Sequence, residues 1–200
     1  MSLATFATQA LADFQSTAAI APSSPSLVEA MTKPLPLETA KTVVELGPGT
    51  GVMTRRILER LPADGRLLAF EINPRFVTYL GEEIDDPRLE VVEAGAEMLN
   101  QELQRRKIGR IDAALSSLGL SLMPPDFVDD ILNGLTSRLS SEAVFTQFQY
   151  VSRIRIADGT ISAFDAKKAL GRFFDQIDRR VIVRNLPPAF VYACRGPRAE

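Results

Sequence analysis

Three glycines at every second position follow a glutamate in the segment Glu45-Leu46-Gly47-Pro48-Gly49-Thr50-Gly51. Glycine permits a tight turn and lets a ligand approach the backbone closely, because it has no side chain. The spacing differs from the G-x-G-x-x-G pattern of dinucleotide sites, and no Walker-type lysine follows, so a phosphate-binding loop is not expected. The segment indicates either a ligand-binding turn or a plain bend between a strand and a helix.

A second acid, Glu71, ends an apolar run 20 residues after Gly51. In doubly wound folds an acid at this place accepts hydrogen bonds from ribose hydroxyls. By itself, a glutamate at the end of a strand can simply be exposed to solvent. Together with the glycine segment, Glu71 predicts a ligand that contains a ribose, and Ile72 follows it at the edge of the same site.

The composition excludes several kinds of catalysis. The 200 residues include no histidine and one cysteine, Cys194. Histidine is the base of Ser-His-Asp and Cys-His hydrolases and a common zinc ligand, so these enzymes are excluded and no metal site is expected. A single cysteine cannot form a disulfide within the chain, and Cys194 is expected to be a small buried apolar residue in a strand.

The elements that position these residues alternate between strands and helices from Lys41 onward. Such alternation is typical of a largely parallel sheet with helices on both faces, which is a doubly wound α/β domain. The last two strands flank Pro187-Pro188 with no helix between them, so they predict a hairpin at one edge of the sheet. Apolar patterning predicts strands over 42–46, 66–72, 89–93, 111–116, 143–150, 181–184 and 190–194, and helices over 51–61, 74–83, 96–106, 125–139 and 161–174.

The chain before the first strand predicts two further helices. Ser24 or Ser26 is expected to cap a short helix that ends near Met31. We expect residues 1–36 to form a helical lid over the carboxyl ends of the strands, and residues 37–200 to form the ligand-binding domain. A helix over residues 3–16 is expected because one face would hold Leu3, Phe6, Ala10, Leu11 and Phe14.

The glycine segment and Glu71 resemble the first motif and the ribose-binding acid of the class I S-adenosylmethionine-dependent methyltransferases. The resemblance covers residues 42–194. It implies a seven-stranded sheet whose last strand is antiparallel, with S-adenosylmethionine as the cofactor. It also implies that Gly47 and Gly49 approach the methionine part, that Glu45 orients the loop or the amino group, and that Glu71 binds the ribose.

A narrower resemblance rests on segments in several parts of the chain. They look like segments of the bacterial phospholipid N-methyltransferases, which methylate phosphatidylethanolamine and whose relatives methylate ornithine lipids. That family is in turn similar to the ribosomal RNA adenine dimethyltransferases. Besides the glycine segment, the resemblance is carried by Ile20-Ala21-Pro22-Ser23-Ser24, Phe145-Thr146-Gln147-Phe148-Gln149-Tyr150 and Asn185-Leu186-Pro187-Pro188-Ala189.

The third motif of the methyltransferases departs from its usual form in this chain. The family places an Asp or Ser before an Ala to contact adenine, whereas this chain has Gly95 before Ala96. The resemblance therefore implies that the Ala96 N–H and Glu97 contact the adenine. The expected cofactor-binding residues are Glu45, Gly47, Pro48, Gly49, Thr50, Gly51, Glu71, Ile72, Ala96 and Glu97.

The segment Ser116-Ser117-Leu118-Gly119, after the fourth strand, bears on the acceptor. RNA and DNA amino-methylases have an Asn or Asp, then Pro and an aromatic at this place, which hold and stack a flipped base. Since this chain lacks them, nucleic acid is not the expected substrate. An amine acceptor must lose its proton before methyl transfer, and Tyr150 at the end of the fifth strand can take it. The expected catalytic residues are Tyr150 and Ser116.

We therefore expect an S-adenosylmethionine-dependent N-methyltransferase that acts on a lipid head-group amine, such as that of phosphatidylethanolamine. Three alternatives stay open: a ribosomal RNA adenine N6-methyltransferase, a small-molecule methyltransferase, and a cofactor-binding subunit without catalysis. The oligomeric state also stays open.

Charge and targeting features bear on the location. No apolar run approaches the ~20 residues that span a bilayer, and the first 32 residues contain no Lys or Arg, so the cytoplasm is expected. Contact with the inner membrane surface stays open. The net charge is −2, but residues 101–200 carry 15 basic and 11 acidic side chains. This basic half could face an anionic partner or form an ordinary solvated surface.

Overall fold

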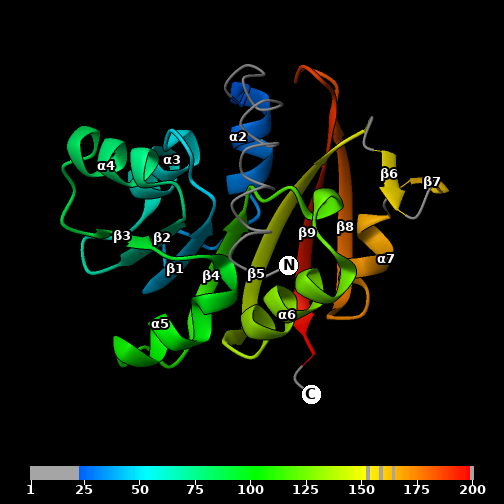
Figure 1. The fold of residues 1–200 in the computed structure, drawn as a ribbon. Coiled ribbons are helices and arrows are strands. Elements are labelled where there is room, and N and C mark those ends of the chain that lie inside the picture. Colours follow the sequence, from blue (N-terminus) through cyan, green and yellow to red (C-terminus); the bar gives the residue numbers. More distant parts are fainter. Residues whose placement is uncertain (1–22, 152–153, 158–159, 164, 199–200) are drawn as a thin grey trace.

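The computed structural model describes residues 23–151, 154–157, 160–163 and 165–198. Within these residues, seven strands form one sheet in the order β3-β2-β1-β4-β5-β9-β8, and β6 and β7 form a separate pair (Figure 1). The strands are β1 (Thr42–Leu46), β2 (Arg66–Glu71), β3 (Leu89–Glu93), β4 (Ile111–Ser116), β5 (Leu139–Tyr150), β6 (Ile154–Ala157), β7 (Thr160–Ala163), β8 (Phe174–Ile182) and β9 (Ala189–Pro197).

The order of the strands reverses at β1. This strand pairs in parallel with β2 on one side and with β4 on the other. In open α/β sheets, ligands bind at this reversal, beside the carboxyl ends of the strands. At the far side of the sheet, β9 is antiparallel to both β5 and β8. The last two strands therefore form the expected hairpin, and β8 is an edge strand.

Helices cover both faces of the sheet (Figure 1). On one face lie α2, α3 and α4; on the other lie α5, α6 and α7. Two short 3-10 helices, η1 and η2, follow β3 and β4. The bounds are α2 (Pro25–Thr32), α3 (Val52–Arg60), α4 (Pro74–Glu83), η1 (Ala96–Met98), α5 (Leu99–Arg105), η2 (Leu120–Leu122), α6 (Pro125–Thr136) and α7 (Ala166–Leu170).

The sheet divides the core into two apolar clusters, because neighbouring residues of a strand point to opposite faces. Val43 packs with Leu27 of α2 and Ile57 of α3. The next residue, Val44, belongs to the larger cluster that includes Leu103 of α5. Every strand near the reversal is thus buried on both sides, which explains why its sequence is almost continuously apolar.

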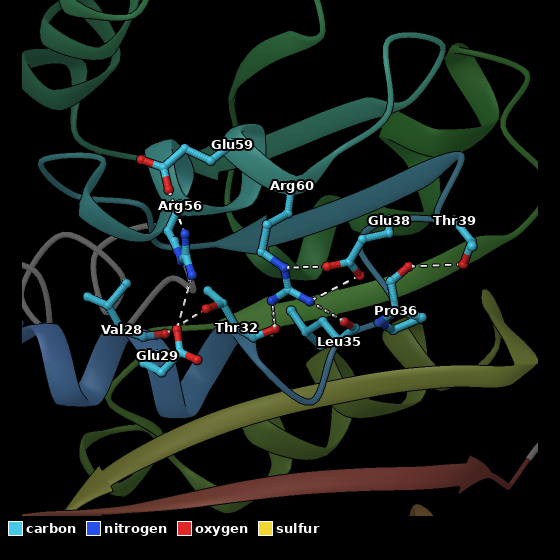
Figure 2. A network of polar contacts seen from close by, with 10 residues as sticks. All are labelled: Val28, Glu29, Thr32, Leu35, Pro36, Glu38, Thr39, Arg56, Glu59 and Arg60. Carbon is cyan, nitrogen blue, oxygen red and sulfur yellow. Dashed lines mark hydrogen bonds and ion pairs between the residues drawn. The ribbon is translucent and has the colours of Figure 1, made fainter.

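The helix α2 is held to α3 by arginines on α3 (Figure 2). Arg60 donates to both carboxylate oxygens of Glu38 and to the carbonyl oxygens of Thr32 and Leu35, at distances between 2.7 and 3.3 Å. Nearby, Arg56 forms ion pairs with Glu29 and Glu59. Arg60 therefore ties the chain that links α2 to β1 onto α3.

Most of the expected elements are confirmed, but the helix predicted over 161–174 is confirmed only over the short α7. The strand β7 occupies the start of that range and pairs with β6, which comes just before it, and β8 begins at its last residue. The reason lies in the sequence between the two strands: Asp158-Gly159 is typical of a two-residue hairpin turn, and the register places Ala157 opposite Thr160. The helix predicted over 3–16 lies outside the described residues.

Candidate functional site

The glycine segment joins β1 to α3 through a turn with three left-handed residues. Gly47, Gly49 and Gly51 have φ angles of +75°, +56° and +77°, which residues with a Cβ rarely adopt. A Cβ on Gly47 would lie 3.0 Å from Cδ2 of Leu118. Around Gly49, a Cβ would meet no heavy atom of the described residues within 4 Å, its chain neighbours aside. The backbone at Gly49 is therefore open to a ligand.

Hydrogen bonds anchor this turn to both neighbouring strands. The N–H of Gly47 donates to the carbonyl oxygen of Phe70 in β2, at 2.9 Å. The N–H of Ser117, which follows β4, donates to the carbonyl oxygen of Leu46, also at 2.9 Å. The turn is thus fixed at the reversal of the sheet, where ligands of this fold class bind.

Glu45 is fully buried beneath the turn. Its Oε2 accepts a hydrogen bond from the Thr54 hydroxyl of α3 at 2.7 Å, whereas its Oε1 has no hydrogen-bond partner among the described residues. Burial raises the pKa of Glu45 to about 7; the bond from Thr54 opposes the rise and the nearby Glu71 charge adds to it. A buried carboxylate oxygen without a partner costs free energy, which a cationic ligand group can recover.

Glu71 lies at the carboxyl end of β2 and is 7% exposed. One carboxylate oxygen accepts from the Gly49 N–H at 3.2 Å, and the other accepts from the Asn73 N–H at 2.9 Å. Burial raises its pKa, and the backbone N–H groups that donate to it oppose this rise. The structure therefore brings the two parts of the sequence prediction, the acid and the glycine segment, into direct contact.

The remaining expected cofactor residues lie along the same edge of the sheet. Within the turn, Pro48 is buried and Thr50 is exposed. Ile72 follows β2 directly and is half-buried. Ala96 and Glu97 begin η1 after β3, and β3 is paired with β2. All of these residues therefore lie near the carboxyl ends of β1, β2 and β3.

The loop after β4 meets the carboxyl end of β5. Ser116 is 1% exposed, and its hydroxyl accepts from the Leu118 N–H at 3.3 Å, so this side chain holds the loop. From β5, the Gln147 side-chain amide donates to the carbonyl oxygen of Leu118 at 3.0 Å. Among the described residues, Oε1 of Gln147 has no hydrogen-bond partner although the residue is 1% exposed. This contact leaves one buried acceptor atom beside the loop.

A small hollow of about 20 Å³ lies between this loop and the end of β5. Gln147 and Tyr150 contribute to its lining from β5, and Ser117 contributes from the loop. Tyr150 also packs edge-on against Phe148, with ring centroids 5.3 Å apart. A hollow of this size holds about one water molecule, so a larger acceptor requires the loop to move.

Thr54, Asn73 and Gln147 contact the site but are absent from the set of residues expected from the sequence. Thr54 lies in the first turn of α3, nine residues after Glu45, and this spacing is the signal that could have found it. Asn73 caps α4 two residues after Glu71. Gln147 has a register partner, Ser116, that only the pairing of β4 with β5 reveals.

Comparison with known proteins gives the family. The model of the ribosomal RNA adenine dimethylase family matches residues 23–107. An ornithine lipid N-methyltransferase from Singulisphaera acidiphila is 33% identical over 180 residues, which cover 90% of this chain and 88% of that enzyme. This chain belongs to the same family of S-adenosylmethionine-dependent methyltransferases. The methyltransferase is also similar, over a shorter stretch, to ribosomal RNA small subunit methyltransferase H from Aromatoleum aromaticum. The identity is 36% over 46% of this chain and 28% of that protein.

Solved structures show the same fold. The 1,6-didemethyltoxoflavin-N1-methyltransferase of Burkholderia thailandensis, with bound 1,6-didemethyltoxoflavin and S-adenosylhomocysteine, has a TM-score of 0.62 and 19% identity, over 84% of this chain and 79% of that one. Human methyltransferase-like protein 13 in complex with SAH has a TM-score of 0.59 and 20% identity, over 85% and 78%. The doubly wound, seven-stranded class I methyltransferase fold expected from the sequence is thereby confirmed.

The cofactor of the methyltransferase is S-adenosylmethionine. This cofactor combines a cationic amino acid part with a ribose, and the site has features that fit both. Glu45 offers a buried oxygen without a partner in the described structure, Glu71 offers a carboxylate at a strand end, and Gly49 offers open backbone. Among the described residues, no group of three or more Cys, Asp or Glu side chains could hold a metal ion.

Proposed function

We propose that the methyltransferase transfers methyl groups to the amine of a lipid head group. The observation that carries the proposal is the extent of its likeness to the ornithine lipid N-methyltransferase, which spans 90% of the chain and includes the acceptor side. The match to the ribosomal RNA adenine dimethylase model, in contrast, covers residues 23–107, which precede β4 and the hollow beside it. That match therefore concerns the cofactor half.

In this proposal, the cofactor lies over the turn at the reversal of the sheet. The backbone at Gly47 and Gly49 approaches the methionine part, and Glu45 orients its amino group. Glu71 accepts hydrogen bonds from the ribose hydroxyls. The Ala96 N–H and Glu97 contact the adenine, and the other expected cofactor residues line the site: Pro48, Thr50, Gly51 and Ile72.

The acceptor amine enters between the loop after β4 and the end of β5. S-adenosylmethionine supplies a methyl group that its sulfonium already activates, so the protein's main task is to hold the amine in line with it. Gln147 accepts a hydrogen bond from the head group through Oε1. Tyr150, as its phenolate, takes the proton that an ammonium must lose before it has a lone pair, and becomes the neutral phenol. Ser116 is a positioning residue, because its hydroxyl holds the Leu118 N–H.

We also propose that residues 1–36 act as a lid and that residues 37–200 form the catalytic domain. The described part of that lid, α2, is fixed to α3 through Arg60 and packs against the sheet. Residues 1–22 lie outside the described residues. In this proposal the enzyme works in the cytoplasm at the inner surface of the membrane. No described helix is long and apolar enough to cross a membrane.

Transfer of labelled methyl groups tests the acceptor. The purified enzyme is incubated with labelled S-adenosylmethionine and, in separate reactions, phosphatidylethanolamine vesicles, ornithine lipid vesicles, small water-soluble amines and ribosomal RNA. We expect label in lipid. Label in RNA alone, or in the water-soluble amines alone, would contradict the lipid proposal.

A matched pair of variants tests the cofactor residues. Glu71→Ala removes the carboxylate that we assign to the ribose, and we expect at least about tenfold weaker S-adenosylmethionine binding by calorimetry, since hydrogen bonds to charged groups are lost. Glu93→Ala removes the exposed register partner of Glu71 on β3 and should leave the affinity unchanged. Equal affinities for the two variants would refute the assignment.

A further inference from the structure

Exposed apolar side chains gather at one place, the turn between β8 and β9. Five large hydrophobic residues are exposed among the described residues, and four of them belong to this turn or lie against it. Val151 adjoins the turn because its N–H donates to the carbonyl oxygen of Pro188 at 2.9 Å. We call residues 181–188 together with Val151 the hairpin tip. Its exposed members and their exposed fractions are Val151 (47%), Val181 (49%), Val183 (74%) and Leu186 (81%).

The hairpin tip is held in shape rather than left loose. Asn185 is 5% exposed, and its side chain makes two hydrogen bonds: Oδ1 accepts from the Ser24 N–H at 3.1 Å, and Nδ2 donates to the carbonyl oxygen of Pro187 at 2.8 Å. The first bond joins the tip to the start of α2. Because the Asn185 side chain is buried and hydrogen-bonded, the next residue, Leu186, points into solvent. Core packing does not explain this exposed leucine, so an apolar contact outside the chain is a reason for it.

Positive charge accompanies the apolar residues. Residues 179–188 include three arginines and no Asp or Glu. All three are exposed: Arg184 lies within the hairpin tip, and Arg179 and Arg180 come directly before it. Apolar side chains with arginines around them match a bilayer that contains anionic lipids, because the apolar groups enter the acyl boundary and the guanidinium groups meet the phosphates.

The hairpin tip lies next to the proposed acceptor entrance. Ala189, the first residue of β9, pairs with Tyr150 of β5 on one side and with Ile182 of β8 on the other. Tyr150 in turn contributes to the lining of the hollow between β5 and the loop after β4. A surface that rests on the tip would therefore be beside the place where a lipid head group has to enter.

We propose that the hairpin tip docks the enzyme onto anionic lipid bilayers and so brings the acceptor entrance to the membrane surface. This inference rests on the proposed lipid acceptor and adds the surface through which the lipid is reached. A second copy of the chain is a poor occupant, since a stable interface buries roughly 800 Å² on each partner, whereas the tip is a single turn. Two copies would also bring like-charged arginines together.

Vesicle binding of a double variant tests this surface. Val183→Asp with Leu186→Asp replaces the two most exposed apolar side chains by negative charges, which an anionic bilayer repels. The matched control is Tyr79→Asp, which changes the fifth exposed hydrophobic residue, on α4. Sedimentation with vesicles of phosphatidylethanolamine and phosphatidylglycerol should give about tenfold or greater loss of binding for the double variant, and none for the control. Cofactor affinity, measured by calorimetry, should stay unchanged in both, which shows that they are folded.

A fluorescent label gives an independent readout. The only cysteine of the chain, Cys194, is buried, so Val183→Cys can be labelled selectively with a polarity-sensitive dye. We expect a blue shift on addition of the same vesicles, and no shift for a dye on Tyr79→Cys. Unchanged emission at position 183, while the protein sediments with the vesicles, would overturn the proposal.

The remaining outcomes separate this inference from the proposed function. If the double variant binds vesicles as the native chain does, the docking surface is wrong, even where methyl transfer to lipid occurs. If the double variant changes the sedimentation coefficient of the protein alone and leaves vesicle binding intact, the tip is a protein contact and the proposal fails. If binding depends on the tip but no lipid is methylated, docking stands and the lipid acceptor fails.

Discussion

Glu45 is a carboxyl group that is closed off from water and has one hydrogen bond, from the Thr54 hydroxyl. Because burial raises its pKa from 4.5 to about 7, the folded state binds the proton more tightly than the unfolded state does. The contribution of this group to stability is therefore fully present below about pH 4.5 and is lost as the pH rises through 7.

The substitution Glu45→Gln should change how stability depends on pH. Gln has nearly the same shape, can still accept from Thr54 and does not titrate. Between pH 5 and pH 8, we expect the free energy of unfolding of the native chain to fall by about 2 to 3 kcal/mol relative to the variant. Urea unfolding without cofactor, at a series of pH values, measures this difference. Curves that stay parallel over this range would show that Glu45 is ionised in the folded state.

At the residue scale, sequence reasoning found the charged groups and missed their neutral partners. Glu45 and Glu71 stand at fixed places relative to three glycines, so their spacing alone suggested a site. Thr54 and Gln147 are ordinary polar residues in a helix and a strand. Their contacts depend on how α3 and β5 pack against the sheet, which no local pattern contains.

Among the elements, α2 and α3 share an apolar cluster, and Arg60 makes the largest set of polar contacts between α3 and the end of α2. Arg60 is 18% exposed and donates to two backbone carbonyl oxygens as well as to Glu38 (Figure 2). The guanidinium group also holds the pKa of the Glu38 carboxyl below its usual value. The two carbonyl oxygens lie at the end of α2 and just beyond it, and each also accepts a backbone N–H, from Leu35 and Leu37 respectively.

Replacement of this arginine should weaken the connection between α2 and α3. We expect Arg60→Ala to lower the free energy of unfolding by about 2 kcal/mol, because hydrogen bonds from a charged group to partly buried carbonyl oxygens are lost. Arg56→Ala is the matched control on the same helix: its ion pairs with Glu29 and Glu59 are exposed, so it should have a much smaller effect. Thermal unfolding of the two variants decides the point, and equal losses would contradict the special role of Arg60.

Element types were predictable where local preference and environment agree. The buried strands β1 and β4, the edge strand β3 and the helix α4 have the bounds that the sequence predicts. The edge strand β8 begins at Phe174, well before the predicted start at Val181. The prediction missed its first residues because most of them are charged or polar, and an edge strand in contact with water tolerates such residues. The pair β6-β7 was missed because β7 falls in the range predicted as one helix and no element was predicted over β6, although Asp158-Gly159 between them is typical of a hairpin turn.

For the whole molecule, the alternation of strands and helices predicted a parallel sheet, but not the order of its strands. The resemblance to the class I methyltransferases implied seven strands with the last one antiparallel, and the order itself comes from the structure. Periodicity cannot supply it, since pairs such as β1 with β4 join segments about 70 residues apart, Val43 lying opposite Ala113. The acceptor side depends on the same long-range pairing, so the hollow beside Gln147 and the place of the hairpin tip were beyond sequence reasoning.

The hydrogen bond from the Ser117 N–H to the carbonyl oxygen of Leu46 has a kinetic consequence. This bond can form only after β4 has paired with β1. That pairing closes a loop of about 70 residues, and the loss of chain entropy comes before the new contacts stabilise the loop. We therefore expect S-adenosylmethionine to bind the native state alone, to slow unfolding and to leave the rate of refolding unchanged. Stopped-flow refolding and unfolding with and without the cofactor measure both rates, and faster refolding would show that the site forms early. The lifetime of the native state, rather than the speed at which it forms, would then follow the concentration of the cofactor in the cell.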